Sequence, residues 1–149
     1  MKICVQSDDF DIAQELNGFG TAPNTGATVT FTGLVRDDTG ALDHLEIEHY
    51  PGMCERAIAK IADEAVQRWA LTDCVVIHRY GKLKVGEQIM MVATAGRHRS
   101  EAFEAAEYLM DYLKSRAPFW KKEVSRDGKQ AEWVSAKGSD EDALKRWSR

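Results

Sequence analysis

The chain has 149 residues, which suits a single domain, and its formal net charge of −4 argues against a general nucleic-acid binder, since such proteins are normally basic. No apolar run approaches the ~20 residues that a membrane-spanning helix needs. The 3 cysteines are widely spaced, which favours a reducing cytoplasm over a disulfide framework or a zinc site. We therefore expect one cytoplasmic domain over residues 1–149.

The first half of the chain is predicted to alternate strands and helices. The pattern predicts a strand over 2–6, a helix over 8–16 capped by Ser7, a loop over 17–25, strands over 26–36 and 41–50, and a helix from Pro51-Gly52 to about Trp69. Gly33 lies on the apolar face of its strand and indicates a bulge or a close backbone approach. An antiparallel hairpin is the simplest pairing for 26–36 and 41–50.

The second half adds buried strands, a long helix and a hairpin. It is predicted to contain strands over 74–80 and 88–95, a helix from Ser100 to just before Pro118, a hairpin of 119–124 with 131–136 about Asp127-Gly128, and a short helix from Ser139. The mixed order predicts an α+β fold with a mostly antiparallel sheet, two long helices and a C-terminal hairpin.

Basic side chains gather along the segment from Thr94 to Lys122. They are Arg97, His98 and Arg99 at the entry of the predicted helix, Lys114 and Arg116 in its last turn, and Lys121 and Lys122 just beyond Pro118. A strand that gives way to a helix N-terminus is a natural anion site. We expect these basic groups to converge on one anionic substrate.

Lys114 is placed by helical spacing at the edge of the apolar stripe, about 20° around the axis from Phe103. Partial desolvation there would lower the pKa of its amine and make it a better acid–base group. The alternative is structural: Lys114 extends past Met110 and pairs with Asp111.

Other polar groups have simpler interpretations. In a strand, Lys121 and Lys122 point to opposite faces, so only one of them enters any given site. Arg36 alone is typical of a solvated strand end. His44, Glu46 and Glu48 share a strand face, but such neighbours usually face solvent, and no metal site is expected.

Several segments together resemble the large, catalytic subunit of molybdopterin synthase. These are FTGLVR, LEIEHYPGM, VIHRYGKLKVGE, RHRSEAFEAAEYLMDYLKSRAPFWKKE and the closing KRW, in that order from about Gly26 to Trp147. The resemblance implies an α/β-hammerhead type of α+β fold and a homodimer, with a small ubiquitin-like subunit docked at each end to form a heterotetramer.

The activity that the resemblance implies is a sulfurtransferase. Sulfur moves from the small subunit's C-terminal Gly-Gly thiocarboxylate, twice, onto cyclic pyranopterin monophosphate, which forms the dithiolene of molybdopterin in molybdenum cofactor biosynthesis. No metal and no organic cofactor takes part in the implied reaction.

The family's functional residues fall on basic positions of this chain. The two lysines correspond to Lys114 and Lys121, the substrate-binding pair to His98 and Arg99, and the strand-end arginine to Arg36, with Lys122 and Glu123 adjoining and Lys137 near the C-terminus. Two departures stand out: Leu34 replaces a lysine of some members, and Lys137 replaces a common arginine. If Lys137 reaches the site of the dimer partner, its amine cannot make the bidentate phosphate contact that an arginine makes.

The hypothesised roles follow from charge. Arg36, His98 and Arg99 hold the pterin phosphate. Lys114 acts as acid–base group or amine nucleophile on the thiocarboxylate, and Lys121 neutralises the thiocarboxylate and the developing oxyanion, although the two lysine roles can be exchanged. Two alternatives stay open: a non-catalytic module that binds a ubiquitin-like tail, and an RNA-binding domain using Phe119, Trp120 and the lysines.

Overall fold

A computed structural model describes residues 1–129, 131–134 and 138–148. The strands described are β1 (Lys2–Gln6), β2 (Ala27–Leu34), β3 (Leu42–His49), β4 (Asp73–Arg79), β5 (Gly81–Lys84), β6 (Gln88–Gly96), β7 (Phe119–Ser125) and β8 (Ala131–Val134). The helices described are α1 (Ile12–Glu15), α2 (Met53–Trp69), α3 (Arg99–Ser115), α4 (Gly138–Leu144) and the 3-10 turn η1 (Lys145–Trp147).

The strands form two sheets. The first has the order β1-β4-β6-β2 and the second β5-β3-β7-β8. β1 runs parallel to β4, and the other strand pairs within the described residues are antiparallel. The predicted α+β class with a mostly antiparallel arrangement is confirmed.

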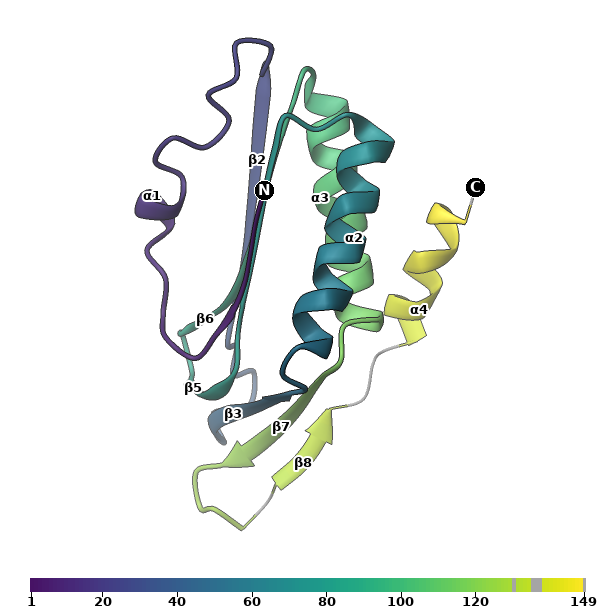
Figure 1. Cartoon of the computed structure of the whole chain (residues 1–149). Helices are drawn as coiled ribbons and strands as arrows, with labels where there is room; N and C mark the ends of the chain where they lie inside the picture. The colour runs from purple at the N-terminus through teal and green to yellow at the C-terminus, as the bar shows by residue number, and fades with distance from the viewer. Residues whose placement is uncertain (130, 135–137, 149) are drawn as a thin grey trace.

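The main core lies between the first sheet and two helices. α2 and α3 lie side by side on one face of that sheet, and α1 with its flanking loops lies on the other (Figure 1). The helices bury Ile58, Ala62, Ala65, Ala105 and Leu109 against Cys74, Val76 and Val92 of the sheet. On the opposite face, Phe10 packs against Ile77, Met91 and Ala93. β4 and β6 are therefore buried on both faces, as their apolar runs predict.

The second sheet lies across one end of the first sheet and of the helices (Figure 1). β7 begins just after Pro118 ends the α3 connection, so the chain passes directly from the last turn of α3 into this sheet. Phe119 packs against both the main core and the small core of Val35, Ile47 and Leu83. This junction fixes how the basic ends of α3 and β7 meet.

The hairpin predicted for 26–36 with 41–50 is wrong. β2 pairs with β6 along its length, and β3 pairs with β5 and β7, so the two strands belong to different sheets. The cause lies at Gly33, where the predicted bulge is confirmed as a register shift between Gly33 and Leu34. A bulge bends its strand, and here the chain leaves the first sheet after it.

Three element boundaries also differ from the predictions. Asp11, not Ser7, caps α1 by accepting a hydrogen bond from the Gln14 N–H, and the helix is one short turn. His98 is the N-cap of α3, and Ser100 lies inside its first turn. Residues 81–84 form the strand β5 where a connection was predicted. None of the described helices is long and apolar enough to cross a membrane.

Candidate active site

Two lysines from different elements meet at the junction of the sheets. Lys114 lies in the last turn of α3, and Lys121 is the third residue of β7. Both line the same two adjoining cavities, of about 360 Å³ and about 540 Å³. The chain segment between them contains Pro118, whose fixed backbone turns the chain from helix into strand. The fold therefore brings the two amines to one place.

The two cavities differ in what surrounds the lysines. The smaller cavity extends toward the end of α3, β8 and the start of α4, and Ser115, Val134, Ser139 and Asp140 are among its lining residues. The larger extends toward β2, and Phe31, Arg36, Met90, Met110 and Glu123 are among its lining residues. The smaller cavity is therefore mainly polar. The larger cavity combines apolar walls with the guanidinium of Arg36.

The amine of Lys121 is the desolvated one. Burial lowers its pKa below the ordinary lysine value, the nearby charge of Lys114 lowers it further, and the carboxylate of Asp140 opposes both. Desolvation and like charge both disfavour the ammonium form. A lysine with a lowered pKa has the neutral amine available nearer to neutral pH, which suits proton transfer or nucleophilic attack.

Lys114 does not sit at the edge of a buried stripe. The neighbour used to place it, Phe103, has 61% of its surface exposed, and Lys114 itself is exposed. Its predicted structural partner, Asp111, instead accepts a hydrogen bond from the Trp147 indole at 2.7 Å and pairs with Arg146 at 2.9 Å. The expected desolvation therefore falls on Lys121 rather than on Lys114.

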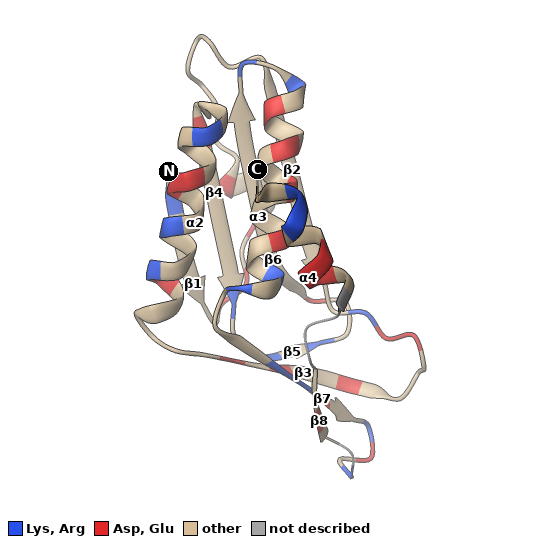
Figure 2. Ribbon diagram, turned by 90° about the vertical axis from the view of Figure 1, so that its right-hand side faces the viewer, with Lys and Arg blue, Asp and Glu red and all other residues tan. Residues whose placement is uncertain are grey.

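Acidic residues of α4 lie beside the basic end of α3. Arg116 pairs with Glu141 at 3.1 Å, and Asp140 lines the smaller cavity. The red first turn of α4 is close to the blue last turn of α3 in Figure 2. Of this acidic group, Asp140 is the carboxylate that acts on the site, because its charge opposes the lowering of the Lys121 pKa.

Three further predicted residues lie around the larger cavity or near it. Arg36 and Glu123 line this cavity, and the Arg36 side chain is largely exposed and pairs with Asp38 at 3.2 Å. Lys122 points to the other face of the sheet, where its amine lies 5.5 Å from the centre of the Trp133 ring. The strand alternation thus sends Lys121 into the cavities and Lys122 away from them.

His98 and Arg99 lie at the opposite end of α3. Both are exposed, and neither lines the cavities described for this chain. At a rise of 1.5 Å per residue, Arg99 and Lys114 are about 22 Å apart along the helix. The prediction that all the basic groups share one hollow is therefore wrong for a single chain.

Two remaining predictions concern the C-terminus and metals. Lys137 lies outside the described residues. Within the described ranges, no group of three or more His, Cys, Asp or Glu side chains is arranged to hold a metal ion.

Sequence reasoning missed two polar residues that line the smaller cavity. His78 lies in the buried strand β4 and also lines the larger cavity, and the Ser115 hydroxyl is buried with no hydrogen-bond partner among the described residues. One signal was present for His78: a polar residue within the apolar run over 74–80 is unusual. Ser115 gave no such signal, because serines near helix ends are common.

The fold and the lysine-lined cavities define an α+β protein with a basic, partly desolvated site. The family model described as MoaE protein matches residues 5–116. The molybdopterin synthase catalytic subunit of Cereibacter sphaeroides is 63% identical over 148 residues, which cover 99% of this chain and 100% of the relative. This chain belongs to the MoaE family.

Solved structures agree with this assignment. The molybdopterin biosynthesis MoaE protein from Burkholderia ambifaria superposes with a TM-score of 0.84 at 46% identity, covering 99% of this chain and 98% of that one. Molybdopterin synthase from Staphylococcus aureus gives a TM-score of 0.80 at 30% identity, covering 88% and 95%.

Proposed function

We propose that this chain is the catalytic subunit of a molybdopterin synthase, a sulfurtransferase of molybdenum cofactor biosynthesis. It moves sulfur from the C-terminal thiocarboxylate of a small ubiquitin-like subunit to cyclic pyranopterin monophosphate and so forms the dithiolene. The observation that carries the proposal is the meeting of Lys114 and the desolvated Lys121 where two cavities join. A two-substrate transfer needs such a junction, whereas a tail-binding module needs one counter-charge.

The lysine roles are assigned by desolvation. Lys121, with its lowered pKa, is the acid–base group or amine nucleophile at the thiocarboxylate carbonyl. Lys114, exposed at the cavity rim, supplies positive charge to the thiocarboxylate and to the oxyanion that develops on its carbonyl. This assignment exchanges the roles that the sequence first suggested.

Each cavity suits one substrate. The larger, with Arg36 for a phosphate and Phe31 and Met110 as apolar walls, is assigned to the pyranopterin. The smaller, between the end of α3, β8 and α4, is assigned to the extended tail of the small subunit. The thiocarboxylate then meets the pterin at the two lysines.

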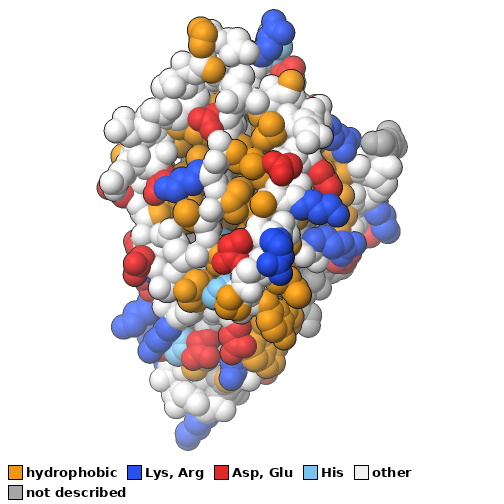
Figure 3. Space-filling view, viewed as in Figure 1, with side chains coloured by type: hydrophobic (Ala, Val, Ile, Leu, Met, Phe, Trp, Pro, Cys, Tyr) orange, Lys and Arg blue, Asp and Glu red, His pale blue; other side chains and the backbone are white. Residues whose placement is uncertain are grey.

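A patch of exposed apolar side chains marks where the small subunit would dock. Hydrophobic side chains gather on the surface where α2 begins and the second sheet runs (Figure 3). The exposed residues of this region include Tyr50, Met53, Trp120 and Trp133. Large aromatic patches of this kind are typical of protein interfaces. Trp120 and Trp133 lie on β7 and β8, on the face of the second sheet that carries Lys122, and Tyr50 and Met53 lie where β3 ends and α2 begins. The same sheet borders, with its other face, the smaller cavity that is assigned to the tail.

His98 and Arg99 are assigned to the site of the second protomer in a homodimer. Phe31, Leu34 and Phe103 leave an exposed apolar surface along β2 and α3, which a second copy can cover. A two-fold axis that crosses this surface at right angles to α3 makes the two helices antiparallel and brings the start of one helix toward the end of the other. The phosphate would then be held by residues of both chains.

The protein is assigned to the cytoplasm. The named relatives are bacterial enzymes of a biosynthetic route, and Cys4, Cys54 and Cys74 are all free thiols, as in a reducing compartment.

Reconstitution tests the proposed function. The purified chain is mixed with a thiocarboxylated small subunit and cyclic pyranopterin monophosphate, and the dithiolene product is measured. Product that increases with the amount of this chain is the expected result. Co-elution with the small subunit without product formation would instead favour the tail-binding module.

A further inference from the structure

His78 stands in the wall that the two cavities share. The residue is 3% exposed, and its ring stacks on Phe119, with ring centres 3.7 Å apart and planes inclined by 13°. Phe119 and Lys121 are two residues apart on β7, so their side chains leave the strand on the same face, about 7 Å apart. The imidazole therefore borders the same two cavities as Lys121 and feels its charge, although no hydrogen bond joins the two side chains in this structure.

The hydrogen bond of His78 fixes its tautomer. The Nδ1 atom lies 2.8 Å from the backbone carbonyl oxygen of Arg79. A carbonyl only accepts, so Nδ1 carries the proton and donates it. In the neutral ring, Nε2 is then left with a lone pair.

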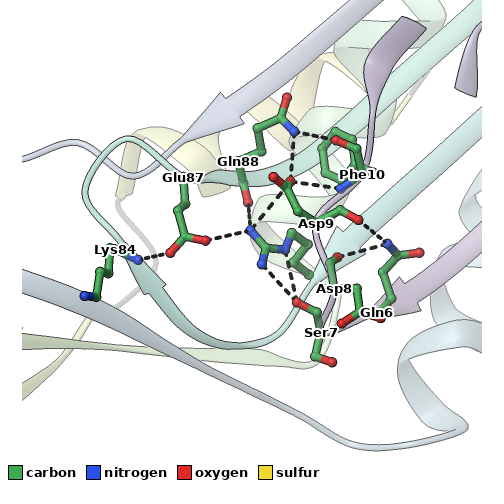
Figure 4. A network of polar contacts seen from close by, with 9 residues as sticks. Gln6, Ser7, Asp8, Asp9, Phe10, Lys84, Glu87 and Gln88 are labelled. Carbon is green, nitrogen blue, oxygen red and sulfur yellow. Dashed lines mark hydrogen bonds and ion pairs between the residues drawn. The ribbon is translucent and has the colours of Figure 1, made fainter. Parts of the chain in front are cut away.

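The side chain of Arg79 holds this part of the backbone in place. Its guanidinium donates to the Ser7 carbonyl at 3.0 Å and to the Gln88 carbonyl at 2.9 Å, and it pairs with Asp9 and Glu87. Figure 4 shows these partners, which come from the segment after β1 and from the start of β6. The carbonyl that orients His78 is therefore held by a buried cation with several partners.

The imidazole is neutral at physiological pH. The pKa of His78 is about 3: burial lowers it most, the hydrogen bond to the Arg79 carbonyl raises it, and the charges of Lys121 and His49 lower it. The groups that face Lys121 in turn are Lys114 of α3 and Asp140 of α4. Because a desolvated ammonium only donates hydrogen bonds, it needs acceptors. His78 Nε2 and the unpartnered Ser115 hydroxyl are such acceptors in the wall of the smaller cavity.

We infer that His78 is a positioning residue of this site, whose Nε2 accepts a hydrogen bond from the Lys121 amine when that flexible side chain turns toward it, and so aims the amine at the reacting carbonyl. The inference rests on the proposed function for its effect on turnover. It does not rest on that function for the hydrogen bond itself.

Three variants in the complete enzyme with its small subunit test the effect on turnover. His78→Phe keeps a ring against Phe119 but removes both nitrogens, and it is expected to lower kcat about tenfold to a hundredfold, as a lost hydrogen bond to a charged group does. The KM for the pyranopterin stays within about threefold, because His78 acts on the lysine rather than on the pterin. His78→Gln, which places an amide oxygen near the position of Nε2, recovers part of kcat.

His49→Phe is the matched control. His49 also stacks on an aromatic ring, with its centre 3.9 Å from that of Tyr80, but lines neither cavity. It is expected to keep the wild-type kcat. Equal kcat losses in His78→Phe and His49→Phe, or a loss confined to KM, would overturn the inference.

Nitrogen-15 NMR of the histidine rings and lysine amines tests the hydrogen bond without any turnover. The expected result is a His78 ring that is protonated on Nδ1 alone down to pH 5, and a Lys121 amine whose pKa falls further in His78→Phe. An Nε2-protonated ring, or a Lys121 titration that His78→Phe leaves unchanged, would refute the inference. An inactive wild type that gives the expected spectra would refute the proposed function alone.

Discussion

The two ends of α3 carry similar basic side chains in different surroundings. At its C-terminal end, the fold turns through Pro118 and places Lys121 beside Lys114, where burial lowers the Lys121 pKa. At its N-terminal end, His98 and Arg99 are exposed. The helix that links these groups in sequence also holds them about 22 Å apart. Burial thus makes the C-terminal end of α3 suitable for chemistry, while the exposed N-terminal end is suited to binding substrate. The dimer proposal assigns that exposed end to the site of the partner chain.

The largest expected effect comes from removing the desolvated amine. Lys121→Ala should lower sulfur transfer by about a hundredfold or more, because a positioned acid–base group contributes about that much. Lys122→Ala is the matched control, since this neighbouring lysine lies over Trp133 on the other face, and it should stay within about threefold. Product formation under saturating small subunit measures both. Equal losses would show that the charge of the segment matters and not the cavity.

Acid should destabilise the C-terminal site through His78. Its pKa is about 3 in the folded chain against an ordinary histidine value of 6.5 in the unfolded chain, so the unfolded chain binds more protons between these values. The stabilisation is complete above pH 6.5 and is lost as the pH falls toward 3, by about 2 kcal/mol at pH 5. Urea unfolding at pH 7 and pH 5 measures it. His78→Phe should reduce the pH dependence by that amount.

Before the N-terminal end of α3, the backbone at Gly26 passes close to the backbone at Arg97, so a side chain added at Gly26 should destabilise the fold. A Cβ on Gly26 would lie 2.2 Å from the Arg97 carbonyl oxygen, so Gly26→Ala should cost about 1–3 kcal/mol of unfolding free energy. Gly96→Ala is the control, because its Cβ would meet Glu101 at an ordinary 3.5 Å. Urea denaturation compares the two. A neutral Gly26→Ala would mean that the turn before α3 adjusts freely.

The smallest effect is expected from the exposed guanidinium at the rim of the larger cavity. Arg36 pairs with Asp38 in solvent, so Arg36→Ala should raise the KM for the pyranopterin about threefold to tenfold and change kcat little. Steady-state kinetics with varied pterin measures this. A kcat loss as large as that of Lys121→Ala would place Arg36 at the reacting atoms instead.

Local sequence patterns predicted most elements of the fold but not which strands pair. The apolar runs of β4 and β6 and the spacing of α2 were sufficient, because their burial follows from periodicity. The pairing of β2 with β6 depends on contacts between residues distant in sequence, and the bulge at Gly33 turns the chain out of the first sheet. Phe103 fits a helical stripe yet is exposed, because the apolar surface on its side of α3 is left uncovered in a single chain.

The candidate site was predictable in its residue types and not in its geometry. Lys114 and Lys121 could be selected from sequence and resemblance, but the identity of the desolvated lysine depends on the fold around Phe119 and His78. His78 looked like part of a buried strand, since nothing local shows that its ring borders a cavity.

Subunit mixing tests most directly the claim that the two ends of α3 serve different sites. Lys121→Ala and Arg99→Ala chains, each impaired alone, are unfolded together, refolded at equal amounts and supplied with small subunit and pterin. If each site takes its lysines from one chain and its arginine from the other, half of the dimers are mixed and one of their two sites is intact. The account predicts about a quarter of wild-type activity. Activity no higher than the mean of the two separate variants would contradict it.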